Sequence, residues 1–574
     1  MTTQHTTLRT RFKSLAGGIG AALTALAALA GLLAAVGSGA APAMAIGRED
    51  TGEVTIGNVE AGTTATAYQV LDVRYDYAAD RPSNPQYVWS EGVRAWVTEH
   101  YPQYIGDDGA VTDQFADLPS DTVVASGSSA DRAPATDIAA FTDALSAAVV
   151  LRKATPADTV TVTATVVAGE EASARFDLPM GGYLIHVTGG AYVYRAVMAN
   201  VIPAFHDGSW RIDPVSIASK RALPGVDKSV NETVPGHVSG KGANGTGSDS
   251  AGIGETVSFD LRADVPVFPA NAVNRRFVLA DALDPGLTLN ADSITVSGVN
   301  AGVEETPLVA GTAYDLVTSD AKDLDGHAVS FLVDMSAERY AAVAGYRSIH
   351  VRYTAVVNRN AVVGPGGNRN EVRLQYSTNP YAQDDHRTER DDVVVYAYGL
   401  AILKTGSDNH PLTGAEFELL DADGATLRVV AVDEARGLYR LPEAGKTEGF
   451  AQSLHVATDA ANPGRLNIAG LDQGDYALRE TKAPEGYVLN STPIAFTIAD
   501  TGKTEDGLGE YTGNVTGQED ANPGYAFGTV ANFKGGLPQT GGVGTVVFGV
   551  VGALLIAGGA VLMATRVGRR ARRR

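Results

Sequence analysis

Short stretches in which apolar and polar residues alternate fill most of the chain between two long apolar runs near its ends. Alternation over a few residues, interrupted by Gly, Asn, Asp and Pro, predicts antiparallel strands. Residues 218–395 and 396–536 follow this pattern almost throughout, and helical periodicity is nearly absent from them. Each of these two stretches is therefore predicted to form a β-sandwich.

Residues 46–217 combine strand-like alternation, for example at Val54 and Ile56, with two predicted helices. One predicted helix carries an aromatic and aliphatic stripe at helical spacing, made of Trp89, Val93, Trp96, Val97 and Tyr101. We interpret this stripe as a core-facing surface and not as a ligand-binding aromatic box, because amphipathic helices bury such a face. The first stretch is predicted to be an α+β domain.

The N-terminal apolar run has the features of an export signal. Basic residues precede the run 15–36, and Ala43-Met44-Ala45 supplies a small-x-small cleavage site. Residues 1–45 are therefore predicted to be a signal peptide, and the mature chain should start near Ile46. The alternative is an uncleaved membrane anchor, since the run is longer than a usual signal core.

The C-terminal run follows the sequence Leu537-Pro538-Gln539-Thr540-Gly541. Residues 543–564 have about the 20 apolar residues that a membrane span requires. The arginine-rich end, 566–574, would stay on the cytoplasmic side. This order of elements in 537–574 resembles the sorting signal of sortase substrates. The resemblance implies cleavage between Thr540 and Gly541, after which Thr540 is joined to an amine.

Composition narrows the possible classes of protein. With 574 residues and 44% hydrophobic composition, the chain is long enough for about three domains. A formal net charge of -21 argues against a nucleic-acid partner, which requires a basic face. Because there are no cysteines, disulfides, thiolate metal sites and cysteine nucleophiles are excluded. An exported chain of this kind needs another covalent staple.

Motifs for cofactors and enzyme chemistry are missing from the sequence. The Gly/Ser-rich insert Ser239–Gly252 does not have the GxxxxGK[ST] spacing of a phosphate-binding loop, and we predict a flexible loop there. The ten histidines are scattered and form no HExxH. No cofactor or metal is expected. The sequence also lacks a nucleophile elbow and paired carboxylates, which would indicate an enzyme.

Three strands of the third stretch carry a polar side chain on their apolar, inward side. The alternation of neighbouring apolar residues puts Lys404, Glu480 and Asn532 inward. Burying an unpaired ammonium or carboxylate costs several kcal/mol, so this placement needs a physical reason. A buried salt bridge is the simplest one.

The surrounding segments favour a different reason. Gly399–Leu420 (GLAILKTGSDNHPLTGAEFELL), Tyr476–Tyr487 (YALRETKAPEGY) and Val530–Lys534 (VANFK) resemble the signature segments of the collagen-adhesin B-type domain of Gram-positive pilins. In that family the lysine and asparagine side chains condense into an isopeptide bond. The resemblance therefore implies a bond between Lys404 and Asn532.

The physical chemistry of buried groups agrees with this implication. Apolar burial lowers the pKa of a lysine and raises that of a glutamate, so Lys404 can become a neutral nucleophile beside a protonated Glu480. Glu480 would then polarise the Asn532 amide and shuttle protons while ammonia leaves. This is a single-turnover reaction of the protein on itself, so the chain is not expected to be an enzyme.

The second stretch repeats the arrangement with an aspartate. Alternation puts Lys228, Asp281 and Asn370 inward. The strings VDKSV, FVLADALDPGLTL and GNRNEVRLQYSTNP resemble the middle domain of shaft pilins, where an aspartate assists a Lys–Asn bond. Asp260 is the rival acid, but its apolar neighbours place it on the opposite, solvent-facing side. We therefore prefer Asp281.

Each implied bond closes a loop of more than 120 residues. By analogy with disulfides, the chain-entropy estimate for such a loop is about 5 kcal/mol. We expect the bonds to join the first and last strands of a sandwich and so to resist tension. In the first stretch, Gly57 and Asn58 stand where a lysine would be expected and Tyr183–His186 has no acid, so no crosslink is predicted there.

The segment Trp210–Lys220 (WRIDPVSIASK) resembles the pilin motif WxxxVxVYPK, with one residue inserted and Ala218-Ser219 in place of Tyr-Pro. Val215 and Ile217 alternate inward, which turns Lys220 towards solvent. The resemblance implies that Lys220 receives the acyl group of the next subunit. The alternative is an ordinary surface lysine.

Together these features predict a mainly β fold, with tandem immunoglobulin-like sandwiches carrying internal isopeptide bonds after an α+β domain. The resemblance implies the shaft subunit of a covalent pilus, secreted and anchored to the cell wall from a transiently membrane-bound precursor. The implied partners are a class C pilus sortase, a housekeeping sortase, other copies of the chain, peptidoglycan or a basal pilin, and a host-surface receptor. A non-polymerising wall-anchored adhesin and a wall-displayed hydrolase are the alternatives.

Overall fold

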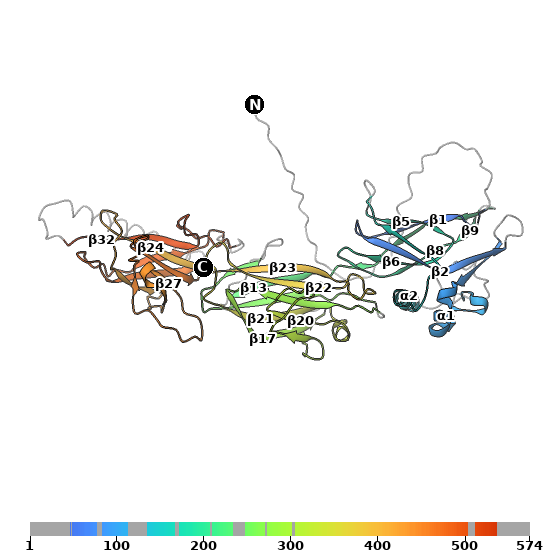
Figure 1. Ribbon diagram of the computed structural model, residues 1–574, viewed down its shortest axis with the longest axis horizontal. Coiled ribbons are helices and arrows are strands. Elements are labelled where there is room, and N and C mark those ends of the chain that lie inside the picture. Colours follow the sequence, from blue (N-terminus) through green and yellow to red (C-terminus); the bar gives the residue numbers. More distant parts are fainter. Residues whose placement is uncertain are drawn as a thin grey trace, which may run out of the picture.

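The computed structural model describes most of the chain between the two terminal apolar runs (Figure 1). The described residues are 46–47, 49–76, 83–112, 135–166, 171–206, 209–232, 247–269, 272–300, 305–502 and 511–535. The predicted signal peptide and the whole of 537–574, with the sorting motif and the predicted span, lie outside them. Within the described ranges, no helix is long and apolar enough to cross a membrane.

The first unit combines sheets with two helices. A larger sheet has the order β3-β2-β6-β8 with β4 paired to β2, and a smaller one has the order β11-β1-β5. The strands are β1 (Thr51–Gly57), β2 (Thr64–Asp76), β3 (Ser83–Trp89), β4 (Thr159–Thr163), β5 (Ala174–Pro179), β6 (Gly181–Thr188), β7 (Val193–Tyr194), β8 (Val197–Val201), β9 (Pro203–His206), β10 (Ser209–Ile212), β11 (Val215–Ala218) and β12 (Arg221–Ala222). The helices are α1 (Glu91–His100) and α2 (Ala135–Val150).

The aromatic stripe of the first unit is a core surface, as predicted, but one helix does not carry all of it, because Trp89 lies on β3 and Tyr101 follows the end of α1. Trp89 ends β3, and Val93, Trp96 and Val97 follow on the buried face of α1. They pack with Phe141 of α2 in one hydrophobic cluster. The helices therefore cover the larger sheet, and the stripe stabilises the unit through apolar burial.

The middle unit is a sandwich of two sheets, ordered β13-β15-β21-β17-β18 and β14-β23-β22-β16-β20-β19. Its elements are β13 (Val226–Glu232), β14 (Gly247–Ser250), β15 (Thr256–Asp264), β16 (Phe277–Leu283), β17 (Leu287–Val299), β18 (Glu305–Pro307), β19 (Asp315–Val317), β20 (Phe331–Asp334), α3 (Tyr340–Val343), β21 (Ser348–Val357), β22 (Asn368–Tyr376) and β23 (Arg387–Tyr396). One large apolar cluster fills the space between the sheets.

The third unit is a second sandwich, ordered β26-β27-β29-β24-β32 and β28-β25-β30-β31. Its strands are β24 (Tyr398–Gly406), β25 (Glu416–Leu420), β26 (Val430–Asp433), β27 (Leu438–Arg440), β28 (Leu454–His455), β29 (Arg465–Leu471), β30 (Gly474–Lys482), β31 (Ile494–Ile498) and β32 (Tyr525–Asn532). The first and last strands, β24 and β32, are parallel neighbours. The mainly β class predicted from the alternation is confirmed.

Two local expectations differ from the structure. Part of the insert Ser239–Gly252 is not a flexible loop, because Gly247–Ser250 forms the buried strand β14, paired in parallel with β23; the insert up to residue 246 lies outside the described ranges. The pairing of the first unit also continues past residue 217, since β12 pairs with β7. In the insert, non-local backbone pairing overrides a local composition that indicates a loop.

The three units follow one another along the long axis of the molecule (Figure 1). The middle and third units meet through backbone contacts, including a 2.8 Å hydrogen bond from Ile253 N to Gly470 O. The first and middle units meet through two tyrosines: Tyr376 donates to Ala191 O at 2.5 Å, and Tyr381 stacks on His186 at 5.1 Å. Specific contacts therefore hold both junctions.

Candidate functional site

The middle unit brings Lys228, Asp281 and Asn370 together between its two sheets. Lys228 lies on β13 of one sheet, and Asp281 and Asn370 lie on β16 and β22 of the other. All three are 0% exposed. Lys228 Nζ donates to Asp281 Oδ2 and, at 2.7 Å, to Asn370 Oδ1. The Lys228 amine and the Asn370 side-chain amide are thus in direct contact.

Tyr353 is a fourth member of this site that the sequence interpretation missed. It lies on β21, and its hydroxyl donates to Asp281 Oδ1 at 2.7 Å. The Tyr353 hydroxyl oxygen also accepts a hydrogen bond from Asn370 Nδ2 at 2.7 Å and another from Lys228 Nζ at 3.0 Å. The sequence feature that could have revealed this residue is a single tyrosine among the otherwise aliphatic inward-facing residues of β21. Its hydroxyl would need partners once buried.

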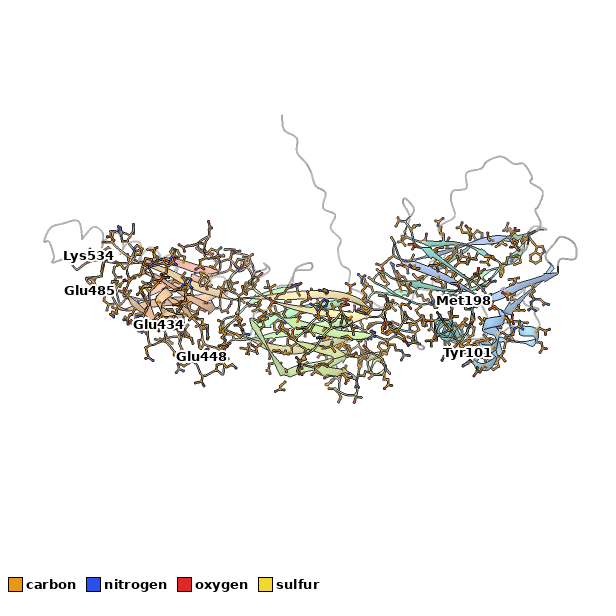
Figure 2. The ribbon with its side chains drawn as sticks, viewed as in Figure 1. Tyr101, Met198, Glu434, Glu448, Glu485 and Lys534 are labelled. Carbon is orange, nitrogen blue, oxygen red and sulfur yellow. The ribbon has the colours of Figure 1, made fainter. Side chains whose placement is uncertain are left out.

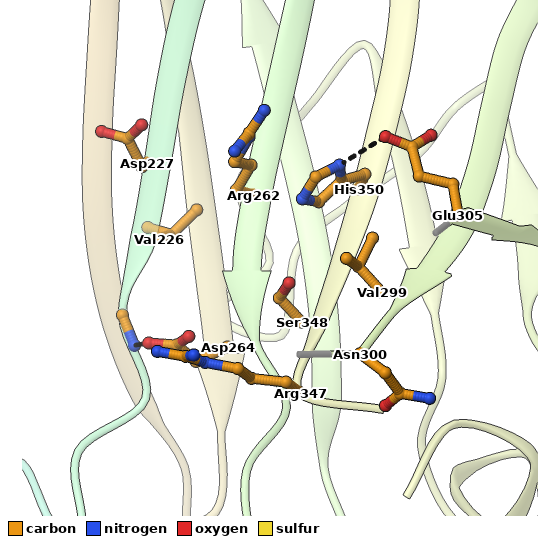
Figure 3. Close-up of a pocket in the computed structure, with 11 residues that line it drawn as sticks. Val226, Asp227, Arg262, Asp264, Val299, Asn300, Glu305, Arg347, Ser348 and His350 are labelled. Carbon is orange, nitrogen blue, oxygen red and sulfur yellow. Dashed lines mark hydrogen bonds and ion pairs between the residues drawn. The ribbon is translucent and has the colours of Figure 1, made fainter. Parts of the chain in front are cut away.

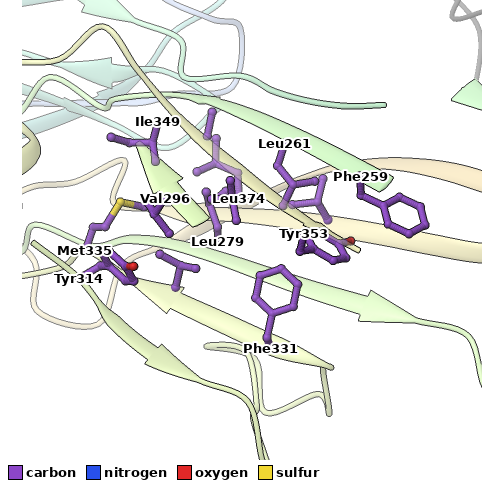
Figure 4. Close-up of a cluster of buried hydrophobic side chains, with 14 of the residues drawn as sticks. Phe259, Leu261, Leu279, Val296, Tyr314, Phe331, Met335, Ile349, Tyr353 and Leu374 are labelled. Carbon is purple, nitrogen blue, oxygen red and sulfur yellow. The ribbon is translucent and has the colours of Figure 1, made fainter. Parts of the chain in front are cut away.

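Aromatic rings enclose this polar group on the core side. Phe259 stacks on Tyr353 at 5.2 Å, and Phe331 meets it edge-on at 4.9 Å. Figure 4 shows these three rings beside the aliphatic part of the cluster. Lys228 Nζ lies 5.5 Å from the centre of the Phe259 ring. The surroundings of the ammonium are therefore apolar apart from its own partners.

Burial changes the protonation of the pair. Loss of solvation lowers the pKa of Lys228, although Asp281 beside it acts in the opposite direction. Loss of solvation raises the pKa of Asp281, against the effect of Lys228. Both shifts favour a neutral amine beside a neutral acid, which is the reactive state of a lysine nucleophile.

The rival acid Asp260 lies on the other face of its sheet. Its carboxylate accepts from Arg352 Nε at 2.6 Å, and the Arg352 side chain is 45% exposed. Arg352 also forms a bidentate pair with Glu305, 2.6 Å for each contact. Asp260 therefore belongs to a surface ion-pair row and does not touch Lys228.

The third unit assembles Lys404, Glu480 and Asn532 in a similar way. Lys404 and Asn532 lie on the paired strands β24 and β32, and Glu480 reaches them from β30 of the facing sheet. Their exposed fractions are 0%, 2% and 1%. Asn532 Nδ2 donates to Glu480 Oε2 at 2.8 Å, and Lys404 Nζ lies 4.0 Å from Glu480 Oε1. One carboxyl group thus faces both nitrogens.

Several polar atoms of this site have unused hydrogen-bonding capacity. Lys404 Nζ donates to Val530 O at 3.0 Å, whereas Glu480 Oε1 and Asn532 Oδ1 are buried without a hydrogen bond. Burial lowers the pKa of Lys404 to about 8, with Glu480 acting in the opposite direction. Unpaired buried acceptors are costly, and such groups call for a functional explanation.

The two sites bridge different pairs of strands. In the third unit, Lys404 and Asn532 lie on the first and last strands, β24 and β32. In the middle unit Asn370 is on β22, and β23 follows it before the chain leaves the unit. The expectation that each bond would join first and last strands is therefore wrong for the middle unit, because its last strand carries no inward asparagine.

The first unit has no comparable group at the corresponding positions. Gly57 ends β1, and Asn58 adopts a positive φ of 57° and donates to Ser219 O at 2.7 Å. His186 is buried at the junction with the middle unit, where desolvation lowers its pKa to about 4. These contacts satisfy Asn58 locally. The absence of a crosslink in this unit stays a prediction.

Lys220 follows β11 on the surface of the first unit. The side chains of Val215 and Ile217 are partly buried and pack on the core, and Lys220 is exposed. Its backbone oxygen accepts from Arg195 N at 3.0 Å, which ties it to the segment after β7. A groove of about 250 Å³ lies beside it. The lining includes Ile138, Thr142, Val197, Met198, Ile217 and Lys220.

Other features of the surface lie away from the buried sites. An open pocket of about 520 Å³ covers the outer face of the middle unit and includes Arg262, Arg347 and His350 (Figure 3). None of the predicted site residues lines it. Among the described residues, a group that could hold a metal ion includes Asp323, but the Arg373 guanidinium already pairs with Asp323 at 2.6 Å.

Fold and sites together define a modular, mainly β protein whose two sandwiches each bury a lysine, an acid and an asparagine. Comparison with known families agrees with this class. Residues 253–380 match the Gram-positive pilin backbone subunit 2, Cna-B-like domain; residues 399–507 match a prealbumin-like fold domain. Residues 529–574 match the LPXTG cell wall anchor motif.

Individual relatives belong to the same class. The chain is 25% identical over 503 residues to the trypsin-resistant surface T6 protein of Streptococcus pyogenes serotype M6, covering 82% of this chain and 76% of that one. It is 27% identical over 379 residues to the fimbrial subunit type 1 of Actinomyces viscosus, covering 61% and 65%. Its fold resembles the solved T6 backbone pilin of Streptococcus pyogenes, with a TM-score of 0.56 at 18% identity, covering 86% and 100%.

These matches support a structural subunit of a secreted, cell-wall-anchored pilus, and the relatives of the chain are surface and fimbrial proteins of Gram-positive bacteria.

The pKa of Lys404 generates a prediction about pH and stability. In an Asn532→Ala variant Lys404 stays a free amine, with a pKa of about 8 when folded and about 10.4 when unfolded. Between these values the unfolded chain binds more protons, so the free energy of unfolding of the third unit should rise as the pH is raised from about 8 to about 10.4. Urea denaturation across this range measures the slope.

The control is Lys404→Met in the Asn532→Ala background, which removes the titrating amine while leaving the same uncrosslinked unit. Its stability should lack the rise that depends on Lys404. Identical pH profiles for the two variants would show that the Lys404 amine is not desolvated in the folded unit.

Proposed function

We propose that this chain is the shaft subunit of its pilus, in which Thr540 of one copy is joined to Lys220 of the next. The observation that carries the proposal is the exposure of Lys220 beside a groove in the first unit, while the anchor motif follows the third unit. Figure 2 shows Lys534, a few residues before that motif, at the far end of the molecule from Met198 of the first unit. The described chain that leads to the motif thus ends far from the groove beside Lys220, which favours an open, head-to-tail polymer.

The chemistry of the link is an acyl transfer. A sortase would break the bond between Thr540 and Gly541 and hold Thr540 as a thioester. The Lys220 amine would attack this thioester, forming an amide and releasing the enzyme thiol. An exposed amine is required for this step, and Lys228, eight residues further on, does not meet the requirement because it is 0% exposed.

Inside each subunit, two isopeptide bonds would stabilise the sandwiches. In each bond the neutral lysine amine attacks the asparagine amide carbon, a new C–N bond forms, and the old C–N bond breaks with loss of ammonia. Direct contact between Lys228 Nζ and the Asn370 amide supports the middle bond. The shared contacts of Glu480 with Lys404 and Asn532 support the third-unit bond.

Such bonds suit a fibre under tension. In the third unit a load that enters along β24 would pass from Lys404 to Asn532 and leave at the end of β32, because the two strands are parallel neighbours. The chain between the two residues would then carry no load. In the middle unit the bond would protect the segment from Lys228 to Asn370, whereas the β22–β23 hairpin would still transmit force.

The proposed partners are a class C pilus sortase for polymerisation and a housekeeping sortase for attachment to peptidoglycan or to a basal pilin. A host-surface receptor is a further proposed partner, for which we assign no binding surface on this chain. A non-polymerising wall-anchored adhesin is the second candidate, favoured by the departure of Ala218-Ser219 from the pilin motif. It differs only in whether Lys220 is used.

Changing Glu480→Ala tests its role as the proton shuttle. The variant should keep the mass of one ammonia that the parent protein loses, because the middle unit still crosslinks. The third unit alone should lose stability, by about 5 kcal/mol on the loop-entropy estimate. Intact-mass spectrometry and thermal unfolding measure both. Glu485→Ala, an exposed glutamate nearby, is the control; loss of both ammonia molecules from Glu480→Ala would rule out the shuttle.

Changing Lys220→Ala tests the intersubunit link. In cells that carry the cognate sortases, the high-mass ladder on denaturing gels should disappear, while monomer stays attached to the wall through Thr540. Lys153→Ala, another exposed lysine of the first unit, should leave the ladder unchanged. A ladder that survives Lys220→Ala would contradict the assignment, and wild-type cells without a ladder would favour the adhesin.

A further inference from the structure

We propose that Tyr353 is a further catalytic residue of the middle-unit crosslink, and that its hydroxyl passes a proton from the attacking nitrogen of Lys228 to the departing nitrogen of Asn370. The inference rests on the proposed Lys228–Asn370 bond. It extends that proposal by naming the group that enables ammonia to leave.

The contacts of the hydroxyl carry the inference. Tyr353 Oη lies 3.0 Å from Lys228 Nζ and 2.7 Å from Asn370 Nδ2, and it donates to Asp281 Oδ1 at 2.7 Å. One oxygen is thus within hydrogen-bonding distance of both nitrogens that change their bonding. A proton relay requires this geometry, since protons pass between atoms within hydrogen-bonding distance. For the transfer to Asn370 Nδ2, the Tyr353 hydroxyl turns its hydrogen away from Asp281 Oδ1, which it contacts before the reaction.

The contacts of the acid show why a relay is needed. Asp281 Oδ2 contacts Lys228 Nζ, and Asp281 Oδ1 contacts the Tyr353 hydroxyl. Asn370 donates its Nδ2 hydrogen bond to Tyr353 and accepts from Lys228 at Oδ1. Asp281 can therefore take a proton from the lysine, but the route from the acid to the departing nitrogen runs through Tyr353.

The proposed sequence of steps balances in atoms and charge. Lys228 gives one proton to Asp281, and the neutral amine attacks the Asn370 amide carbon to form a C–N bond. The new nitrogen then loses a proton to the Tyr353 oxygen while the Tyr353 hydroxyl proton moves to Asn370 Nδ2. The old C–N bond breaks, ammonia leaves, and Tyr353 is again a neutral phenol.

The state of the phenol suits this role. Burial raises the pKa of Tyr353 well above its ordinary value, and the neighbouring Asp281 acts in the same direction. The group therefore stays a hydroxyl, which can accept one proton and donate another at the same time. An ionised phenolate would have no proton to give.

The third unit provides an internal comparison. There, the carboxyl of Glu480 faces both nitrogens by itself, with Oε2 at 2.8 Å from Asn532 Nδ2 and Oε1 at 4.0 Å from Lys404 Nζ. The shorter Asp281 side chain does not hydrogen-bond to Asn370, and Tyr353 bridges the two. Aspartate plus tyrosine in one unit would thus perform the task of a single glutamate in the other.

The test is Tyr353→Phe in the full chain, which keeps the ring and removes the hydroxyl. Pulse-labelled cell-free synthesis followed by timed denaturation and mass analysis gives the rate of each ammonia loss. The middle-unit bond should form at least about 10²-fold more slowly, as general acid–base groups contribute about 10²–10⁴-fold. The third-unit bond should form at its normal rate. Tyr340→Phe, another buried core tyrosine that donates a hydrogen bond, should form both bonds normally.

The outcomes separate this inference from the proposal beneath it. If the unchanged protein never forms the Lys228–Asn370 bond, the crosslink proposal fails. If the bond forms equally fast in Tyr353→Phe, the crosslink stands and the relay is wrong. Asn370→Ala supplies the uncrosslinked reference, so a slow Tyr353→Phe variant should initially melt as Asn370→Ala does.

If Tyr353→Phe melts at a lower temperature than Asn370→Ala, the substitution has damaged the fold. The relay is then tested in the unchanged protein. Its rate of middle-unit bond formation is measured in mixtures of H2O and D2O. A relay moves two protons in one step, so the rate should depend on the deuterium fraction along a curve. A linear dependence, as for one moving proton, would overturn the relay.

Discussion

The burial of a lysine amine against a carboxyl group and an asparagine amide is the constraint on which the two sandwiches depend. Lys228 and Lys404 are both 0% exposed, and a charged ammonium in such surroundings is costly. The cost falls if the proton moves to the neighbouring acid, and it disappears if the amine becomes part of an amide. The same burial that strains the unreacted core therefore makes the amine a nucleophile.

This constraint explains how a chain without cysteines can serve in an extracellular fibre. The family matches are to a pilin backbone domain and a cell-wall anchor motif, and the structure adds two buried groups in consecutive sandwiches. The first unit has no such group at the corresponding positions and instead presents the exposed Lys220. In the proposed function, internal stabilisation and intersubunit linkage use different lysines: Lys228 and Lys404 are buried, and Lys220 is exposed.

Much of the site could be predicted because strands have a side-chain period of two. Asp281 and Asn370 are spaced two residues from apolar neighbours on their strands, so their side chains are predicted to point inward with those neighbours. In the structure both side chains contact Lys228. Tyr353 was missed because an inward tyrosine is indistinguishable from ordinary core until its hydroxyl partners are known. Strand β14 was missed because its partner β23 lies more than 140 residues away in sequence, and composition does not report non-local pairing.

The most direct test of this account is the intact mass of the mature protein, combined with tandem mass spectrometry of its proteolytic peptides. The account predicts a mass lower than the sequence mass by two ammonia molecules, with Lys228 joined to Asn370 in one branched peptide and Lys404 joined to Asn532 in the other. A protein of full sequence mass, with all four residues recovered in unbranched peptides, would contradict it.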